Sequence, residues 1–305
     1  MSIYENTIIN EIGNIYISIV MTTYNRLKQT LFTLNIINEL QKSKKYNIQI
    51  IIVDDSDYSM IDKLKNYNEN IQINYIYIDR TKKTWINPCI NYNIGFKYIL
   101  GEKIIIQNSE VCYVGDILEF VDKSLCINNY YVFDVKASKS LDTNTMIYDC
   151  YGGKKFDVNI FNKPFFSEWY QNKKEKNYMM HFLVSITRDS FLKIKGFDEN
   201  YKDAIDYDDN DFLMKILYNN IKPVNICNDQ YKLGGIHLFH EKFFYNKNLP
   251  TNEELFYKKL IVYNEHNVYI EDVNEFSNYN IPISNHLLNK QLLVKIFYKN
   301  IVIKI

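Results

Sequence analysis

Residues 15–26 read IYISIVMTTYNR and residues 48–56 read IQIIIVDDS. Each segment is an apolar run of strand length that ends in polar residues, which is typical of a strand buried on both faces of a parallel sheet. Between the two runs, leucine and isoleucine recur at helical spacing over residues 26–42. This strand–helix–strand order predicts an α/β protein with a mostly parallel sheet flanked by helices.

The same alternation continues to about residue 136. Further strands are predicted at residues 73–78, 103–107 and 130–135, and further helices from Asn87 and after Gly115. Residues 137–177 lose this periodicity, and we expect them to form a long excursion over the active face. Beyond the excursion we expect a strand at residues 181–186, a short helix from Arg188 and a helical stretch at residues 212–217.

The composition excludes several classes of protein. Hydrophobic residues make up 47% and charged residues 24% of the 305 residues, as in a folded globular chain. Lys plus Arg equals Asp plus Glu at 36 each, whereas nucleic-acid-binding proteins are usually basic, so we expect no nucleic-acid partner. The five cysteines form no C-x-x-C pair, which favours reduced thiols in a cytoplasmic setting.

The N-terminus shows no signal-peptide pattern, and no uncharged apolar run approaches the roughly 18 residues of a membrane span. The amino-acid composition is biased, with 27 Tyr and 18 Phe against 9 Gly and 5 Pro. We interpret this bias as an AT-rich genome of a virus, a low-GC bacterium or a protist. The expected location is therefore the cytoplasm, which would be that of the host if the source is viral.

Polar clusters end three of the predicted strands, at residues 22–25, 54–57 and 108–110. In open α/β sheets, ligands bind outside the carboxyl ends of the strands, so we expect these clusters to form one crevice. Taken singly, each cluster has an ordinary alternative, because Asp, Asn and Ser are also favoured in turns and helix caps.

Two further patterns carry residue types suited to catalysis. Residues 206–211 read DYDDND, and clustered carboxylates repel one another, which raises at least one pKa and favours a general base. The alternative is that these acids satisfy the N–H groups of a helix N-terminus. His237 and His240 are three residues apart, a spacing that allows both to ligate one metal ion, although a single His is more often structural.

In their order along the chain, these segments resemble the motifs of the GT-A glycosyltransferases. The likeness is to glycosyltransferase family 2 and to the galactosyltransferase-type enzymes that share its C-terminal motif. Residues 18–26 resemble the nucleotide-binding opening, residues 50–56 the second-strand motif, and NYNIG at residues 91–95 the helix motif A-R-N-x-G. GFDE at residues 196–199, followed by DDNDF at residues 208–212, resembles the acceptor motif G-F-D-E…E-D-x-D.

The resemblance implies a GT-A type, Rossmann-like domain over residues 1–248. Its nucleotide-sugar half would occupy about residues 15–136 and its acceptor half about residues 137–248. Residues 249–305 would form a C-terminal helical extension.

The resemblance also assigns roles to the acids of the C-terminal motif. Asp209 matches the catalytic base of inverting members, and Asp208 stands beside it as a second catalytic residue. Asp211 matches the last acid of the motif and is assigned to acceptor binding. Trp169 is expected to provide an apolar platform for an acceptor sugar, with a core position as the alternative.

A metal site follows from the same resemblance. Glu110 matches the last position of the D-x-D metal motif, whereas Asn108 replaces its first Asp and removes one carboxylate. His237 and His240 match the metal element H-x-x-H of the galactosyltransferase-type enzymes. We expect Glu110 and both histidines to bind Mn²⁺ or Mg²⁺ against the diphosphate, with Mn²⁺ favoured by the mixed nitrogen and oxygen ligands.

The donor nucleotide is expected to contact residues of the strand ends and of the helix motif: Thr22, Tyr24, Asn25, Arg26, Asp54, Asp55 and Asn93. The leading hypothesis is an inverting transferase that moves a hexose from a UDP-linked donor to a hydroxyl of a glycan or glycoconjugate acceptor. The alternative is a GT-A-like protein that binds sugar nucleotides or glycans and has lost catalysis. A Rossmann oxidoreductase is disfavoured, because no G-x-G-x-x-G follows the first strand.

The C-terminal stretch at residues 283–305 has four lysines, no acid and many Leu and Ile. One interpretation is a peripheral contact with a membrane that presents the enzyme to a lipid-linked acceptor. The other is a helix that packs on its own domain or on a second copy of the chain in a homodimer.

Overall fold

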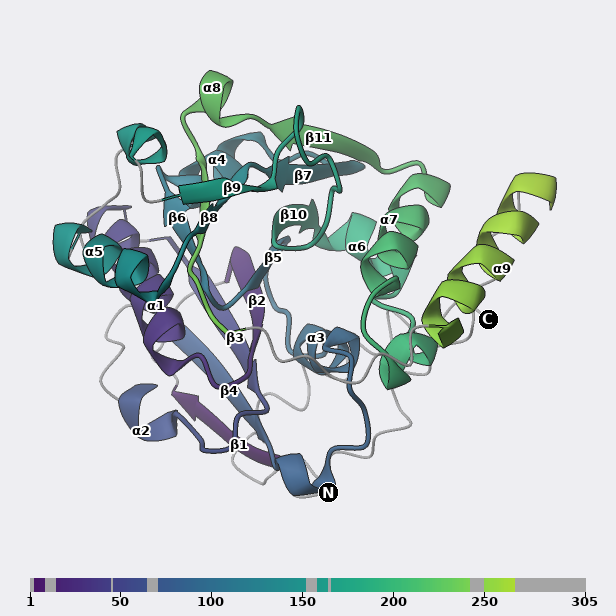
Figure 1. The fold of residues 1–305 in the computed structure, drawn as a ribbon, viewed down its shortest axis with the longest axis horizontal. Coiled ribbons are helices and arrows are strands. Elements are labelled where there is room, and N and C mark those ends of the chain that lie inside the picture. Colours follow the sequence, from purple (N-terminus) through teal and green to yellow (C-terminus); the bar gives the residue numbers. More distant parts are fainter. Residues whose placement is uncertain are drawn as a thin grey trace.

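The computed structural model describes residues 3–8, 15–44, 46–64, 71–151, 158–163, 166–241 and 250–266. The strands of the main sheet are β1 (Ile3–Ile8), β2 (Ile17–Thr23), β3 (Ile48–Asp54), β4 (Gln72–Ile78), β5 (Lys103–Asn108), β7 (Asn129–Phe133), β10 (Leu183–Thr187) and β11 (Lys222–Ile226). They lie in the order β1-β4-β3-β2-β5-β10-β7-β11 (Figure 1). The central strands β4, β3, β2 and β5 are parallel, whereas β1 and β10 run antiparallel to their neighbours.

A second, four-stranded sheet adjoins the first. It consists of β6 (Val111–Val114), β12 (Gly234–His237), β8 (Val135–Ser138) and β9 (Phe166–Gln171), in that order. Only two residues separate β5 from β6, and one separates β7 from β8, so the chain passes directly from the main sheet into the small one. Glu110 lies at the first of these passages.

The helices are α1 (Leu27–Lys44), α2 (Ile61–Leu64), α3 (Cys89–Phe96), α4 (Ile117–Ser124), α5 (Leu141–Tyr151), α6 (Arg188–Ile194), α7 (Asp208–Tyr218), α8 (Asn228–Tyr231) and α9 (Pro250–His266). Short 3₁₀ helices occupy Arg80–Lys82, Val158–Asn162 and Glu199–Asp203. In Figure 1, α1 and α5 lie on one side of the main sheet, and α3, α6 and α7 lie on the other.

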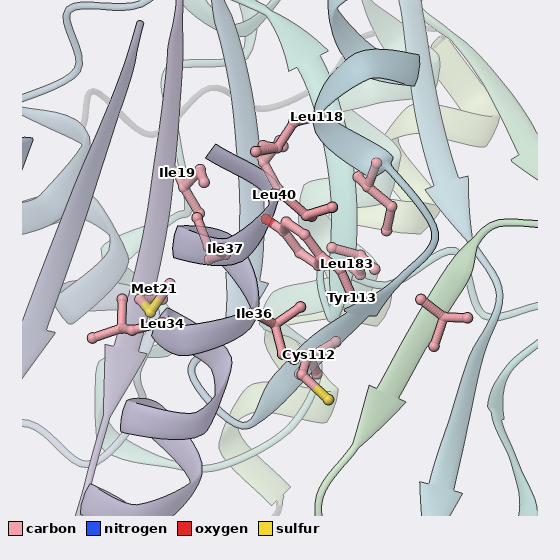
Figure 2. Packing of buried hydrophobic residues seen from close by; sticks show 14 of the residues in the cluster. Ile19, Met21, Leu34, Ile36, Ile37, Leu40, Cys112, Tyr113, Leu118 and Leu183 are labelled. Carbon is pink, nitrogen blue, oxygen red and sulfur yellow. The ribbon is translucent and has the colours of Figure 1, made fainter. Parts of the chain in front are cut away.

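The helices cover two separate hydrophobic cores, because successive side chains of a strand point to opposite faces. Ile19 and Met21 of β2 join the core under α1, whereas Val20 joins the core under α3. Figure 2 shows Leu34 of α1 beside Met21 and Ile37 beside Ile19. Both faces of the sheet are therefore buried, as the uninterrupted apolar runs predicted.

Gly95 explains how closely α3 approaches the sheet. A Cβ atom at this position would lie 2.9 Å from Cγ1 of Val20 and 3.1 Å from Cγ2 of Val53. Any larger residue would push the helix away from β2 and β3. The glycine that ends the motif at residues 91–95 is thus required by packing.

The predicted strands and helices up to residue 136 are confirmed, with shifts of at most two residues at their ends. The excursion predicted for residues 137–177 is wrong, because this region contains α5 and the strand β9. The strands β1, β6, β8 and β12 were not predicted. Residues 250–266 form the helix α9, and the basic stretch at residues 283–305 lies outside the described residues. Within the described part of the chain, none of the helices has the length and apolar character needed to cross a membrane.

Candidate active site

The three polar clusters predicted at strand ends lie at the same edge of the main sheet. β2 pairs with both β3 and β5, and the register places Thr23 beside Asp54 and Thr22 beside Asn108. The parallel direction of these strands brings their carboxyl ends together. These strand ends therefore lie together, at the position predicted for the crevice.

Glu110, His237 and His240 form a cluster at this edge. One ligand atom from each residue lies within 4.8 Å of the other two, and no other group of three or more His, Cys, Asp or Glu with this spacing occurs in the part of the chain that the structure describes. His237 ends β12, which pairs with β6, and the N–H of Leu238 donates to the carbonyl of Glu110 at 3.0 Å. This pairing brings together residues that are more than 120 positions apart in the sequence.

The carboxylate of Glu110 is fully buried and lies beside the guanidinium of Arg26 and the imidazoles of His237 and His240. Its Oε1 lies 2.5 Å from Nη1 of Arg26, 3.3 Å from Nε2 of His237 and 3.5 Å from Nε2 of His240. Burial by itself raises the pKa of Glu110, but Arg26 and the two histidines outweigh burial and hold it well below its usual range. Glu110 is therefore a carboxylate at neutral pH.

His237 is held in place by Tyr170 of β9. The two rings stack with centroids 4.1 Å apart and an interplanar angle of 13°. Burial lowers the pKa of His237, so its imidazole is neutral at pH 7, which is the form that binds metal ions. Its Nε2 is buried and makes no hydrogen bond of acceptable geometry among the described residues. This nitrogen, together with the converging Glu110 and His240, fits a divalent cation with mixed nitrogen and oxygen ligands.

Asn108, which replaces the first Asp of the expected metal motif, is held by a neighbouring side chain. The hydroxyl of Tyr92 donates to Oδ1 of Asn108 at 3.0 Å and lies 2.9 Å from the carbonyl oxygen of Gln107. Tyr92 is 1% exposed, and it belongs to the helix motif on α3. The amide of Asn108 is thus positioned by α3 at the edge of the crevice.

The second cluster consists of the acids at the start of α7. Asp206 and Tyr207 precede the helix with φ angles of +78° and +70°, in the left-handed region that non-glycine residues rarely adopt. Asp208 is buried, and its Oδ1 accepts a hydrogen bond from Nδ2 of Asn87 at 2.9 Å. Burial and the nearby charge of Asp209 raise the pKa of Asp208 to about 7. The cap at the N-terminus of α7 is Tyr207, without a side-chain hydrogen bond, so these acids do not act as the cap.

Asp209 is the accessible acid of this cluster. Its side chain is 21% exposed, and its Oδ1 forms an ion pair with Nδ1 of His181, whose side chain is 7% exposed. His181 was not predicted as a site residue. It precedes β10, whereas Asp209 lies on α7, so only the fold brings the two together.

The structure corrects the prediction that Asp211 binds the acceptor. Its side chain is fully buried, with carboxylate oxygens 3.8 Å from Nζ of Lys215 and 3.6 Å from Nζ of Lys259. Lys259 of α9 also forms a buried ion pair with Asp198 of the GFDE motif. Because its carboxylate is enclosed by these lysines, Asp211 supports the motif from within and does not contact an acceptor.

One tyrosine contacts each cluster: Tyr170 stacks on His237, and Tyr92 meets His181, the partner of Asp209, edge-on. Burial, followed by the charge of Glu110, raises the pKa of Tyr170 to about 12, and Asp209 adds to this effect. The pKa of Tyr92 is also raised, chiefly by burial and in addition by Glu110 and Asp209. Both carboxylates therefore act on both tyrosine rings.

Two residues predicted to contact the donor nucleotide are buried and form hydrogen bonds with other parts of the protein. Asp54 is fully buried, and its oxygens accept hydrogen bonds from the hydroxyl of Tyr75 at 2.5 Å and the N–H of Ser56 at 2.9 Å. Asn93 is 1% exposed and exchanges hydrogen bonds with the backbone of Phe197 at 2.8 and 2.9 Å. Both are corrected: Asp54 orders the turn after β3, and Asn93 fastens α3 to the GFDE motif.

The other predicted donor residues lie at the carboxyl ends of β2 and β3 or directly after them. Arg26 reaches Glu110, and Asp55 forms an ion pair with Lys83, a cation that the prediction missed. The guanidinium of Arg80 lies 4.1 Å from the ring centroid of Tyr24. Asn25 is exposed and Thr22 half-buried, and the backbone of Asn25 is left-handed with a φ angle of +53°.

Trp169 and Tyr170 are adjacent on β9 and therefore point to opposite faces of the small sheet. Tyr170 faces His237, whereas the ring of Trp169 packs 5.7 Å from that of Phe161 and beneath the ammonium group of Lys136 at 4.9 Å. The aromatic residue beside the metal cluster is thus Tyr170. No contact of Trp169 among the described residues links it to the crevice.

A large, mostly parallel sheet flanked by helices, with polar clusters at its strand ends, has the architecture of the GT-A glycosyltransferase fold. The model of the family described as "Glycosyl transferase family 2" matches residues 18–191, which is more than half of the chain. The chain therefore belongs to glycosyltransferase family 2. No curated protein matches it.

Solved glycosyltransferases share the fold at low sequence identity. A structure of TarS 1-349 from S. aureus in complex with UDP-GlcNAc aligns with a TM-score of 0.53 and 16% identity, covering 81% of this chain and 66% of that chain. A longer TarS structure gives a TM-score of 0.51 and 15% identity, and the match covers 82% of this chain but 39% of that one. The catalytic domain of Drosophila β1,4-galactosyltransferase 7 in complex with xylobiose gives a TM-score of 0.47 and 10% identity, covering 80% and 79%.

Proposed function

We propose that this chain is an inverting glycosyltransferase that moves a hexose from a UDP-sugar to a hydroxyl of a glycan or glycoconjugate acceptor. The observation that carries the proposal is the convergence of Glu110, His237 and His240 at the carboxyl edge of the sheet. This is where a nucleotide diphosphate binds in open α/β folds. The UDP-GlcNAc complex of TarS supports a UDP-linked donor.

Glu110, His237 and His240 would hold Mn²⁺ or Mg²⁺. The cation, when bound, neutralises the negative charge that develops on the departing diphosphate. Arg26, which contacts Glu110, is placed to contribute a second positive charge at the same location. Tyr170 keeps the ring of His237 in the orientation that presents Nε2 to the cluster.

Asp209 is proposed as the general base. The acceptor hydroxyl gives its proton to the Asp209 carboxylate while its oxygen forms a bond to the anomeric carbon. The bond from this carbon to the diphosphate oxygen breaks, and the electron pair leaves with UDP. Because the base and the diphosphate act on opposite faces of the sugar, the configuration at the anomeric carbon is inverted. The partial exposure of Asp209 beside the buried Asp208 supports the choice between the two acids.

The metal site is tested by isothermal titration calorimetry with Mn²⁺, in the presence and absence of UDP. We expect His237→Ala and His240→Ala each to weaken Mn²⁺ binding about tenfold or more, in line with the effect of losing groups around a metal site. The matched control is Asp229→Asn, which removes an exposed acid of α8 and should leave the affinity unchanged.

The reaction is tested by incubating the protein with a panel of UDP-sugars, Mn²⁺ and hydroxyl acceptors. We expect Asp209→Asn to bind the donor normally and to lose about 10²- to 10⁴-fold in transfer rate, as for the loss of a general base. A protein that binds and hydrolyses no UDP-sugar, or an Asp209→Asn variant with wild-type transfer, would overturn the proposal. Donor binding without transfer to any acceptor would favour a sugar-nucleotide-binding protein instead.

A further inference from the structure

We propose that His181 is a positioning residue for Asp209, fixing one oxygen of that carboxylate so that the other faces the acceptor. This inference rests on the proposed role of Asp209 as the base. It starts from the ion pair between Nδ1 of His181 and Oδ1 of Asp209.

Because Oδ1 of the Asp209 carboxylate is buried against His181, we take Oδ2 as the oxygen that meets the acceptor. Oδ1 is fully buried, whereas the side chain as a whole is 21% exposed. A carboxylate that is fixed at one oxygen has lost rotational freedom about its last torsion, so the second oxygen is already oriented when the acceptor arrives.

The ring of His181 is itself held by aromatic side chains. Tyr92 and Phe197 meet it edge-on, with centroids 4.9 and 5.0 Å away and interplanar angles of 78° and 75°. Phe182 lies roughly parallel to it, with centroids 6.0 Å apart. The residue is 6% exposed. Because these rings leave little room for another rotamer, the imidazole is a rigid anchor for Asp209.

The charges around His181 favour its protonated form. The groups that face it are Asp208 and Asp209 of α7 and the neutral ring of Tyr92 of α3. Burial lowers the pKa of His181, but the two carboxylates, chiefly Asp209, more than compensate and raise it. An imidazolium beside these acids also reduces the repulsion between Asp208 and Asp209, which would otherwise drive their side chains apart.

His181 also differs from the metal-binding histidines in its surroundings. It makes no contact with Glu110, His237 or His240 among the interactions of the described residues, and it is not a member of the metal cluster. A change at His181 should therefore act on the chemical step and leave the metal and donor sites intact. This separation makes the inference testable apart from the proposed function.

The test compares two variants of the full chain. His181→Leu removes the polar contact, whereas His181→Asn places an amide nitrogen near the position of Nδ1 without the charge. We expect His181→Leu to lower kcat about 10²-fold, the lower end of the range for acid–base groups. The KM for the UDP-sugar and the Mn²⁺ affinity should stay within about twofold of wild type. His181→Asn should recover most of kcat, with a flatter alkaline limb in the pH profile, because the amide does not titrate.

A double-mutant cycle separates the two proposals. If His181 acts through Asp209, the change His181→Leu should have no further effect on kcat in the Asp209→Asn background. Equal losses of kcat in the Leu and Asn variants would overturn the positioning role, and so would effects that add in the double mutant. A wild-type rate for Asp209→Asn would instead overturn the function on which this inference rests.

Discussion

Lys259 of α9 and Asp198 of the GFDE motif form a buried ion pair, although they are 61 residues apart in the sequence. Their side chains are 3% and 2% exposed. Burial by itself raises the pKa of Asp198, but Lys259 outweighs it and lowers this pKa below its usual range. The helix α9, which lies beyond the segment matched by the family model, is thus part of the support for the acid cluster.

We expect Lys259→Met to destabilise the protein by about 3–5 kcal/mol, because it leaves the carboxylates of Asp198 and Asp211 buried with one cation fewer. The free energy of unfolding from urea denaturation measures this change. Lys258→Met is the matched control, since Lys258 is exposed on the same helix, and it should have an effect within about 0.5 kcal/mol. Equal stabilities for the two variants would contradict the role given to the buried pair.

The raised pKa of Asp208 predicts a pH-dependent stability. The folded state holds the Asp208 proton up to about pH 7, whereas the unfolded chain releases it near its ordinary value of 3.8. Between these values the folded state binds more protons, so this residue contributes a loss of stability as the pH rises from about 4 to 7. Above pH 7 Asp208 is ionised in both states, and the full free-energy cost of burying its carboxylate lowers the stability of the folded state.

We therefore expect Asp208→Asn to be more stable than wild type at pH 8, on the order of 4 kcal/mol, since the pKa is raised by roughly three units and each unit corresponds to about 1.4 kcal/mol. The gain should shrink as the pH falls to 4 and vanish below it, where wild-type Asp208 is protonated in the unfolded state as well as in the folded state. Thermal unfolding at several pH values measures it. Asp203→Asn, at a nearby exposed acid, should give no such pH-dependent difference. A gain that is the same at pH 4 and pH 8 would count against the raised pKa.

Arg26 is predicted to compete with the metal ion for Glu110. Its guanidinium lies 2.5 Å from the carboxylate, so a bound cation meets a positive charge at close range. We expect Arg26→Gln to bind Mn²⁺ alone about tenfold more tightly and UDP alone more weakly, since the diphosphate loses a positive partner. Calorimetric titrations with each ligand alone measure the two effects.

The matched control for Arg26 is Lys28→Gln, which removes an exposed cation from the same end of α1. It should change neither affinity by more than about twofold, because exposed charges are screened by salt. A loss of Mn²⁺ affinity in Arg26→Gln would show that Arg26 supports the metal cluster and does not compete with it.

The parallel core of the fold was predictable because its strands are continuous apolar runs, and the order β2, α1, β3 is visible in the residue pattern. The strands β6 and β12 have four residues each, too few for a period to appear. The sequence around β9 also showed no periodicity that would predict a strand. The small sheet that carries His237 and Tyr170 was therefore missed, although His237 itself was found from its spacing to His240.

The sequence pattern did not reveal which motif residues the fold buries. Asp54, Asn93 and Asp211 occupy motif positions, yet each is buried and bound by other parts of the protein. A sequence pattern does not distinguish a polar residue that contacts ligand from one that holds the motif together. His181 was missed because its partner Asp209 is distant in sequence, and Tyr92 and Tyr170 were hidden among 27 tyrosines.

The left-handed backbone before α7 gives the last prediction. Nδ2 of Asn252 in α9 lies within hydrogen-bond distance of three carbonyl oxygens: those of Tyr201 at 3.1 Å, Ala204 at 3.1 Å and Asp206 at 3.0 Å. Asn252 is 2% exposed. These contacts hold the loop in which Asp206 and Tyr207 adopt positive φ angles, a conformation that costs about 1–3 kcal/mol for each residue.

We expect Asn252→Ala to destabilise the protein by about 1–3 kcal/mol, because the carbonyls of Tyr201 and Asp206 lose this donor, whereas that of Ala204 keeps Asn87. Because the loop leads directly into Asp208 and Asp209, kcat should also fall, with the KM for the UDP-sugar unchanged. Hydrogen exchange at residues 201–207, compared with Glu254→Ala at an exposed position of α9, measures the loosening of the loop. Wild-type exchange in this segment despite the substitution would show that the positive φ angles are held by the loop itself, and α9 would then have no role in orienting the base.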